Sequence, residues 1–184
     1  MDKMILDATA GNRTMWNWKK VPDMIYIDIE KKLERKPTIF ADNTNTPFLP
    51  ASFDTIFYDP PHNWGGKDEP CPQYPSEIRK WKMKHQPFAF TYYGWDKYKT
   101  KQQLIAHIYK AQKEFLRILK KDGLLWFKWN EMKVSLRKIL AIFDLWAVLL
   151  IIYVKSPTQT AGMHQTFWVC MTKKREETVQ TRLG

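Results

Sequence analysis

Four short apolar segments in the N-terminal part of the chain each end in an aspartate, and this ordered set constrains the fold more than any other feature. The segments are Met4–Asp7, Met24–Asp28, Thr38–Asp42 and Phe53–Asp59. Each has the length of a buried strand and is followed by small, polar or turn-forming residues. Open α/β sheets bind their ligands at the carboxyl ends of the strands. The pattern therefore predicts an α/β protein whose strand-end acids mark the ligand-binding edge.

The first segment leads into the small residues Ala8-Thr9-Ala10-Gly11-Asn12 and then into Arg13–Lys20, which we interpret as a helical turn. A strand, an acid, small residues, a glycine and a helix form the signature of a first nucleotide-binding βα unit. The G-x-G-x-x-G pattern is missing. This argues against a dinucleotide oxidoreductase, because a pyrophosphate needs close backbone approach at several points.

Asp28 ends the second segment, 21 residues after Asp7. This spacing suits an acid that accepts hydrogen bonds from ribose hydroxyls, with Glu30 as the alternative. A solvated acid at a strand end is the simpler interpretation of either residue taken alone.

The fourth segment ends in the tetrapeptide Asp59-Pro60-Pro61-His62. Proline donates no backbone hydrogen bond, so the strand stops at Asp59. The Asp59 carboxylate and the Pro60 carbonyl are two acceptors held side by side. Together they can bind the two hydrogens of an exocyclic amino group and direct the nitrogen lone pair at an electrophile. The alternative is a loop turn with a capped end.

The tetrapeptide resembles motif IV of the amino-methyltransferases, which use S-adenosylmethionine to methylate adenine N6, cytosine N4 or guanine N2. Those enzymes usually carry Tyr, Phe or Trp at the fourth position, where this chain has His62. The segment Leu6–Asn12 is similar to motif I of class I methyltransferases, with Arg13 in place of the usual second glycine. Asp42 and Asn43 match motif III, which approaches the adenine amino group.

The resemblance implies an S-adenosylmethionine-dependent N-methyltransferase that acts on an exocyclic amino group of a DNA or RNA base. The base must be flipped or already single-stranded to reach such a pocket. The implied catalytic residues are Asp59, Pro60, Pro61 and His62, whose ring would stack on the base. The implied cofactor-binding residues are Asp7, Ala8, Thr9, Ala10, Gly11, Asp28, Asp42, Asn43 and Asp59.

The resemblance also implies one doubly wound, Rossmann-like α/β domain with a seven-stranded, mostly parallel sheet and an antiparallel last strand. The C-terminal half supplies matching elements. We predict helices over 101–121 and 134–143, strands over 124–129, 146–155 and 164–171, and a charged tail over 174–184. Thr100 caps the first helix and Gly123 ends it. The strand over 146–155 is continuously apolar, which predicts burial on both faces.

Residues 62–101 contain two adjacent glycines, four prolines, nine aromatic residues and eight Lys or Arg residues. Aromatic and cationic side chains in alternation suit unstacked bases and phosphates, so we predict a substrate lid. The predicted substrate-binding residues are Trp64, Arg79, Lys80, Trp81, Lys82, Lys84 and, at the catalytic edge, Lys128. The alternative is a small hydrophobic cluster with a solvated basic face.

The formal net charge of the 184-residue chain is +11, which favours a nucleic-acid partner over a merely solubilising surface. Cys71 and Cys170 are far apart and show no metal-ligand spacing, so we expect a reducing cytoplasm and no metal site. No secretory signal opens the sequence, and the apolar run 145–154 is too short to span a bilayer. We expect a single domain over 1–184 that does not bind membranes.

Two further interpretations stay open. The acceptor of the methyl group can instead be a protein glutamine or a small-molecule amine. The chain can also be a non-catalytic scaffold with the methyltransferase fold; Arg13 favours this, whereas Asp28 and Asp59 argue against it. Because no target-recognition domain is apparent, a partner protein for target recognition is a further possibility. DNA and RNA are not distinguished.

Overall fold

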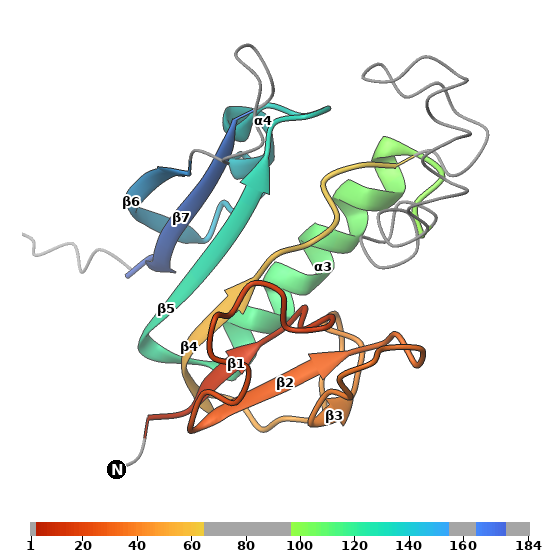
Figure 1. Ribbon diagram of the computed structural model, residues 1–184. Coiled ribbons are helices and arrows are strands. Elements are labelled where there is room, and N and C mark those ends of the chain that lie inside the picture. Colours follow the sequence, from red (N-terminus) through yellow and green to blue (C-terminus); the bar gives the residue numbers. More distant parts are fainter. Residues whose placement is uncertain (1–2, 65–96, 155–164, 176–184) are drawn as a thin grey trace, which may run out of the picture.

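The computed structural model describes residues 3–64, 97–154 and 165–175, which contain one seven-stranded sheet. The strands are β1 Ile5–Asp7, β2 Met24–Asp28, β3 Ile39–Phe40, β4 Phe53–Tyr58, β5 Leu119–Asn130, β6 Trp146–Val154 and β7 Thr166–Lys173. Their order is β3-β2-β1-β4-β5-β7-β6. The first five strands in this order are parallel, and β7 is antiparallel to both β5 and β6 (Figure 1). This confirms the predicted Rossmann-like methyltransferase fold, with its winding reversed between β1 and β4.

The main helix, α3, spans Lys101–Ile118 and packs on one face of the sheet. Its predicted apolar stripe is confirmed, because Leu104, Ile108, Ala111, Phe115 and Ile118 are fully buried. The Thr100 hydroxyl caps it by accepting from the Gln103 N–H at 3.2 Å. A second helix, α4, is short (Leu136–Leu140) and joins the same core. Neither described helix is both long enough and apolar enough to cross a membrane.

The predicted C-terminal end of α3, at residue 121, is wrong. The helix stops at Ile118 and β5 begins at the next residue, Leu119, which pairs with Phe53 of β4. Gly123 therefore lies inside a strand, not at a helix end. A Cβ atom on Gly123 would lie 2.7 Å from the Leu119 side chain and 3.0 Å from the Asp54 carbonyl oxygen, so close packing explains this glycine.

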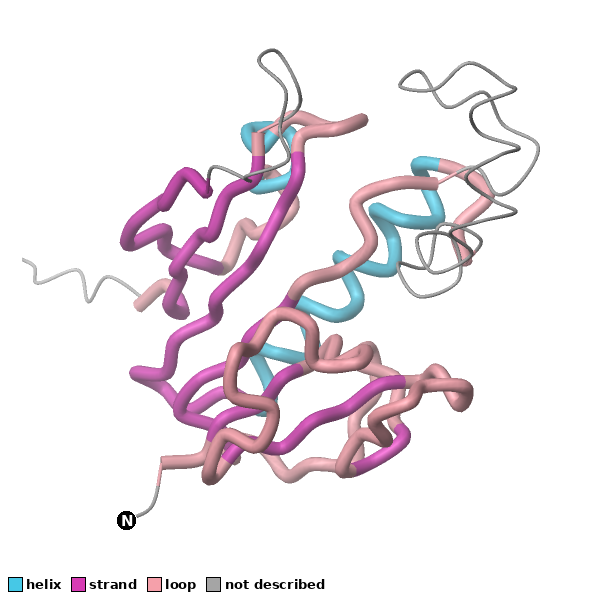
Figure 2. Tube along the Cα trace, in the orientation of Figure 1, coloured by secondary structure: helices cyan, strands magenta, loops and turns pink. Residues whose placement is uncertain are grey.

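The predicted helical turn over Arg13–Lys20 is also wrong. The β1–β2 connection consists of turns (Figure 2), and Arg13 has a positive φ of 59°. The Arg13 guanidinium donates to the backbone carbonyls of Lys19 at 2.7 Å and Lys36 at 3.0 Å. It also lies 3.9 Å from the centre of the Tyr26 ring. These contacts stabilise a compact loop where a helical turn was predicted.

Strand β6 corrects a third prediction. It lies at the edge of the sheet and pairs, among the described strands, with β7 alone. Its side chains from Val148 to Tyr153 are 43–55% exposed, and only Trp146 is buried. A continuous apolar run indicates burial on both faces only where neighbouring elements cover the strand, and the topology leaves β6 without them.

Candidate functional site

A cavity of about 470 Å³ lies at the carboxyl ends of β1, β2 and β4, next to the loop that follows β3. This position spans the point between β1 and β4 where the winding of the sheet reverses, which is the usual ligand position in such folds. Eight of the nine predicted cofactor residues line it: Ala8, Thr9, Ala10, Gly11, Asp28, Asp42, Asn43 and Asp59. Its volume is in the range of small-molecule sites.

The predicted cofactor loop is fastened to the end of β2. Gly11 has a positive φ of 48°, a conformation that favours glycine, and its N–H donates to Asp28 Oδ2 at 2.9 Å. Asp28 Oδ1 accepts from the Glu30 N–H at 2.8 Å. Each carboxylate oxygen has further lone pairs. Asp28 can therefore shape the loop and still accept hydrogen bonds from a ligand in the cavity.

Arg13 does not line the cavity, although its neighbours Asn12 and Thr14 do. Its side chain is held on the far side of the loop by Lys19, Lys36 and Tyr26. The replacement of the second motif I glycine therefore leaves the cavity open.

Asp7 is placed differently from the other strand-end acids. Its side chain is fully buried and does not line the cavity. Asp7 Oδ1 accepts from the Thr9 N–H at 3.1 Å, and Oδ2 accepts from the Trp16 indole N–H at 2.7 Å. Burial raises the pKa of Asp7 to about 6, although these hydrogen bonds act in the opposite direction. In this position Asp7 stabilises the loop after β1 through these two hydrogen bonds and does not face the cavity.

The loop after β3 presents Asp42 and Asn43 to the cavity. Asp42 Oδ1 accepts from both the N–H and the hydroxyl of Thr44, at 2.8 Å each. The Asn43 amide nitrogen donates to the Ala8 carbonyl at 3.1 Å. The Asn43 Oδ1 atom is buried and accepts no hydrogen bond from the part of the chain that the structure describes. Asn43 is thus a polar residue of the cavity wall whose amide is held against the backbone of the loop after β1.

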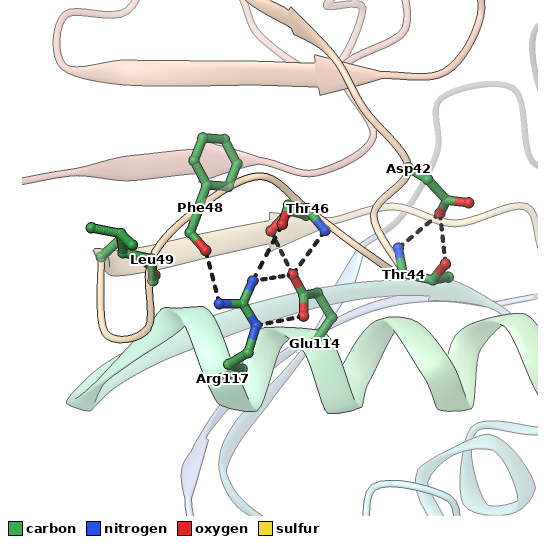
Figure 3. A network of polar contacts seen from close by, with 8 residues as sticks. Asp42, Thr44, Thr46, Phe48, Leu49, Glu114 and Arg117 are labelled. Carbon is green, nitrogen blue, oxygen red and sulfur yellow. Dashed lines mark hydrogen bonds and ion pairs between the residues drawn. The ribbon is translucent and has the colours of Figure 1, made fainter.

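This loop is anchored to α3 by the polar network in Figure 3. Glu114 Oε1 accepts from the Thr46 N–H at 2.8 Å and from the Thr46 hydroxyl at 2.6 Å. The Arg117 guanidinium donates to Glu114 at 2.6 Å and to the Phe48 carbonyl at 2.8 Å. Burial raises the pKa of Glu114, but hydrogen bonds from Arg117 and Thr46 outweigh it and hold that pKa below its usual range. The network fixes the loop that carries Asp42 and Asn43.

Asp59 connects the predicted cofactor loop, Ala8–Asn12, to the tetrapeptide tip Asp59–His62. Its backbone N–H donates to the Thr9 hydroxyl oxygen at 2.8 Å. Its Oδ2 atom lies 2.7 Å from the Lys128 ammonium, which reaches across from β5. Both side chains are partly buried, with exposed fractions of 22% for Asp59 and 29% for Lys128. Lys128 thus lies beside Asp59 but does not line the cavity, and its predicted role in substrate binding stays a prediction.

The rest of the tip is placed less directly at the cavity. Pro61 lines the cavity, and Pro60 is buried. His62 does not line it; its ring centre lies 6.5 Å from that of Trp129 in an edge-to-face arrangement. Trp64 packs with Lys133, whose ammonium lies 4.4 Å from the indole centre. The predicted lid residues Arg79, Lys80, Trp81, Lys82 and Lys84 lie outside the described residues.

Lys97, Tyr98 and His107 also line the cavity and were not among the predicted site residues, although Lys97 and Tyr98 belong to the predicted lid segment 62–101. We interpreted His107 as a packing residue, but it lines the cavity with its ring centre 5.2 Å from that of Tyr98. Burial lowers the pKa of His107 and raises the pKa of Tyr98. The sequence shows His107 next to the apolar stripe of α3. It does not show which part of the chain packs against that side of the helix.

The cavity is acidic although the chain is strongly basic. Asp28, Glu30, Asp42 and Asp59 line it, and Lys97 is the one Lys or Arg among its described lining residues. This charge suits a cationic ligand or one rich in hydrogen-bond donors, and it disfavours phosphates. Within the described ranges, no group of three or more His, Cys, Asp or Glu side chains could hold a metal ion.

No protein-family model and no curated protein matches the sequence. Solved structures do match the fold. The PH0226 protein from Pyrococcus horikoshii OT3 has a TM-score of 0.58 and 10% identity, over 95% of this chain and 83% of that one. A TehB-like SAM-dependent methyltransferase from Corynebacterium glutamicum has a TM-score of 0.52 and 12% identity, over 94% and 80%. A geranyl diphosphate methyltransferase in complex with SAM has a TM-score of 0.53 and 8% identity, over 94% and 78%. At these identities the likeness shows the fold.

Proposed function

We propose that this protein is an S-adenosylmethionine-dependent N-methyltransferase that acts on an exocyclic amino group of a nucleic-acid base. One observation carries the proposal: the loop with Gly11 lies at the same cavity as Asp59 and Pro61 of the tip, and the 2.8 Å hydrogen bond from the Asp59 N–H to Thr9 joins the two. A binding site for the methyl donor and a binding site for an amine are thereby held in fixed relation.

The residues of the cavity fit S-adenosylmethionine. This cofactor carries an ammonium and a sulfonium, which the acidic lining favours, and it has no phosphate. Asp28 is placed to accept from ribose hydroxyls. Asp42 and Asn43, which both line the cavity, suit the rim around the adenine amino group. The two methyltransferases compared above support the same cofactor, and one of them is a complex with SAM.

The chemistry at the tip rests on Asp59 and Pro60. S-adenosylmethionine would supply an electrophilic methyl group. The Asp59 carboxylate and the Pro60 carbonyl accept the two hydrogens of the substrate amino group, which turns the nitrogen lone pair out of conjugation with the ring. Lys128 holds Asp59 Oδ2, so Asp59 Oδ1 is left for the amine and for the proton that the nitrogen loses. Lys128 thus determines which oxygen of Asp59 binds the substrate amine.

The nucleic-acid acceptor is supported by the net charge of +11. An acidic cavity within a basic protein separates two tasks: the surface attracts a polyanion, while the cavity selects a cationic cofactor and a neutral base with an amino group. The amine of a protein or small molecule would make no use of the basic surface.

The test is transfer of radiolabelled methyl groups from S-adenosylmethionine to total RNA, genomic DNA and protein. Asp59→Ala removes the amine acceptor, and Asp122→Ala, at a 72% exposed carboxylate on β5, is the matched control. We expect label in one nucleic acid, a loss of at least about 100-fold in Asp59→Ala, and unchanged transfer in Asp122→Ala. Cofactor affinity, measured by calorimetry, should be retained in all three proteins.

Other outcomes separate the alternatives. Label in protein would keep the chemistry of the tip and contradict the nucleic-acid acceptor. Full transfer in Asp59→Ala would contradict the role of the tip. An absence of both transfer and cofactor binding in the unmodified protein would favour the non-catalytic scaffold.

A further inference from the structure

The exposed strand β6 is the largest apolar feature that the proposed function leaves unexplained. Six consecutive side chains, Val148, Leu149, Leu150, Ile151, Ile152 and Tyr153, are between 43% and 55% exposed. Isolated exposed apolar residues are normal on protein surfaces. A continuous row of six on one strand is a patch, and patches of this size usually mark an interaction site.

The strand is firmly placed, so its exposure does not come from fraying. It pairs with β7 from Trp146 to Val154, with one register shift between Val148 and Leu150. Trp146 is 3% exposed, and its indole N–H donates to Gln112 Oε1 of α3 at 2.7 Å. The opposite backbone edge of β6 pairs with no other described strand.

Among the described residues, this edge carries one feature that normally hinders strand addition, the register shift between Val148 and Leu150, and it lacks most of the others. Edge strands are commonly protected by a charged residue, a proline, an inward-pointing charge or a covering element. Residues 146–154 contain no charged residue, no proline and no glycine. The nine-residue strand is therefore a ready template for backbone hydrogen bonds with another strand.

Both faces of β6 are apolar. Leu150 and Ile152 lie opposite Cys170 and Trp168, which places them on one face of the sheet. Ile151 lies opposite Val169, a member of the core that the helices cover, so it belongs to the other face. A strand added beside β6 would need apolar side chains on both faces, and β6 itself has them.

We propose that β6 pairs antiparallel with β6 of a second copy of this chain. A strand that pairs with itself in this way satisfies two-fold symmetry, the commonest symmetry of soluble oligomers. Two copies with a net charge of +11 each repel one another, and a contact free of charges is where they can approach. The six half-exposed side chains would bury roughly 500 Å² per copy, or about 1,000 Å² in all, near the lower limit of a specific interface.

The geometry has a consequence for the two sites. The two-fold axis runs perpendicular to the sheet, because antiparallel pairing keeps each face of one copy level with the same face of the other. The parallel strands of the two copies then point in opposite directions. The two cavities, which lie at the carboxyl ends of these strands, are therefore on opposite sides of one continuous sheet. We expect two independent cofactor sites with equal affinity.

Sedimentation equilibrium of the full chain at several concentrations tests the proposal. Ile151→Lys places a charge at the centre of the contact, and Leu49→Lys, at a loop residue that is 77% exposed, is the matched control. We expect a dimer for the unmodified chain and for Leu49→Lys. For Ile151→Lys we expect the dissociation constant to rise by at least about 100-fold. Unchanged circular dichroism would show that this variant is folded.

Hydrogen exchange gives a second readout that needs no variant. The β6 amide protons on the edge away from β7 should become protected as the protein concentration rises through the dimer dissociation constant. A monomer at every concentration would overturn the proposal. A dimer that persists in Ile151→Lys, or β6 amides whose exchange does not depend on concentration, would do the same.

Discussion

Strand β4 lies in the middle of the sheet and β6 lies at its edge, although β6 is the more apolar of the two. β4 contains Asp54 and Thr55, yet Phe53, Ile56 and Tyr58 are at most 1% exposed. Every residue of β6 is apolar, yet most of the strand is about half exposed. Apolar content therefore does not decide how deeply a strand is buried in this protein.

The difference lies in the neighbours of each strand. β4 pairs with β1 and β5, and α3 packs against its inner face. β6 pairs with β7 alone among the described strands. In β4 a buried side chain serves the stability of one chain. In β6 the same kind of side chain is available to a partner, which is why we connect this strand with self-association.

The largest effect that sharpens this comparison comes from matched truncations of Ile56 in β4 and Ile151 in β6. Ile56 is 0% exposed and Ile151 is 49% exposed. We expect Ile56→Ala to lower the free energy of unfolding by about 2–5 kcal/mol, through lost burial and the cavity left behind. Ile151→Ala should cost the monomer about 1 kcal/mol or less.

Urea unfolding at a protein concentration below the dimer dissociation constant measures both values. Similar losses in the two variants would show that β6 is covered in the monomer. That result would also remove the ground for a second copy at this edge.

The sequence predicted the positions of the aspartates at the strand ends better than the burial of the apolar side chains within the strands. Asp28, Asp42 and Asp59 line the cavity as expected, because an acid that follows a buried strand has to leave the core at the sheet edge. The same signal did not distinguish Asp7. Its burial depends on the indole of Trp16, which a loop brings back over β1, and no local pattern shows such a return.

Other errors have the same physical origin. Gly123 is as typical of a helix end as of a tight strand contact, and only the pairing of Leu119 with Phe53 decides between them. His107 of α3 lines the same cavity as residues that follow β1, β2 and β3. Both outcomes depend on contacts between residues that are distant in the sequence, whereas strand-end acids and helical stripes are local.

The second prediction compares the two ends of β2, the strand that leads to the cavity. Asp28 ends the strand and lines the cavity, and Asp23 precedes the strand and is exposed. Asp28→Ala removes the acceptor of the Gly11 N–H and the predicted ribose acceptor. We expect a 10- to 100-fold weaker affinity for S-adenosylmethionine, the range for hydrogen bonds to a charged group, about 1.5–3 kcal/mol.

Calorimetry measures the affinities, and Asp23→Ala should bind like the unmodified protein. If Asp28→Ala retained full affinity, the cavity would not be the cofactor site. The aspartates at the ends of the N-terminal strands would then have a structural role only.

The third prediction concerns Thr9, whose hydroxyl joins the cofactor loop to the catalytic tip. Thr9→Val keeps the shape of the side chain and removes the acceptor of the Asp59 N–H. One neutral hydrogen bond contributes about 1 kcal/mol, so we expect kcat to fall roughly 5- to 10-fold while cofactor affinity stays unchanged. Thr9→Ser restores the hydroxyl and should recover most of the rate. A parallel loss of affinity in Thr9→Val would instead assign Thr9 to cofactor binding.

The smallest effect tests why Asp7 differs from the acids of the cavity. Burial raises its pKa from 3.8 to about 6, and the Trp16 hydrogen bond limits this rise. Because the folded state binds the proton more tightly, the contribution of Asp7 to stability is fully present below pH 3.8 and is lost as the pH rises through about 6. Trp16→Phe removes the indole donor, so the pKa of Asp7 should rise further and the loss of stability at neutral pH should grow. Carboxyl ¹³C NMR titration measures this shift, with Trp18→Phe, at a 63% exposed indole, as the control that leaves Asp7 unchanged. An unaltered titration in Trp16→Phe would show that the Trp16 hydrogen bond does not contribute to the pKa of Asp7.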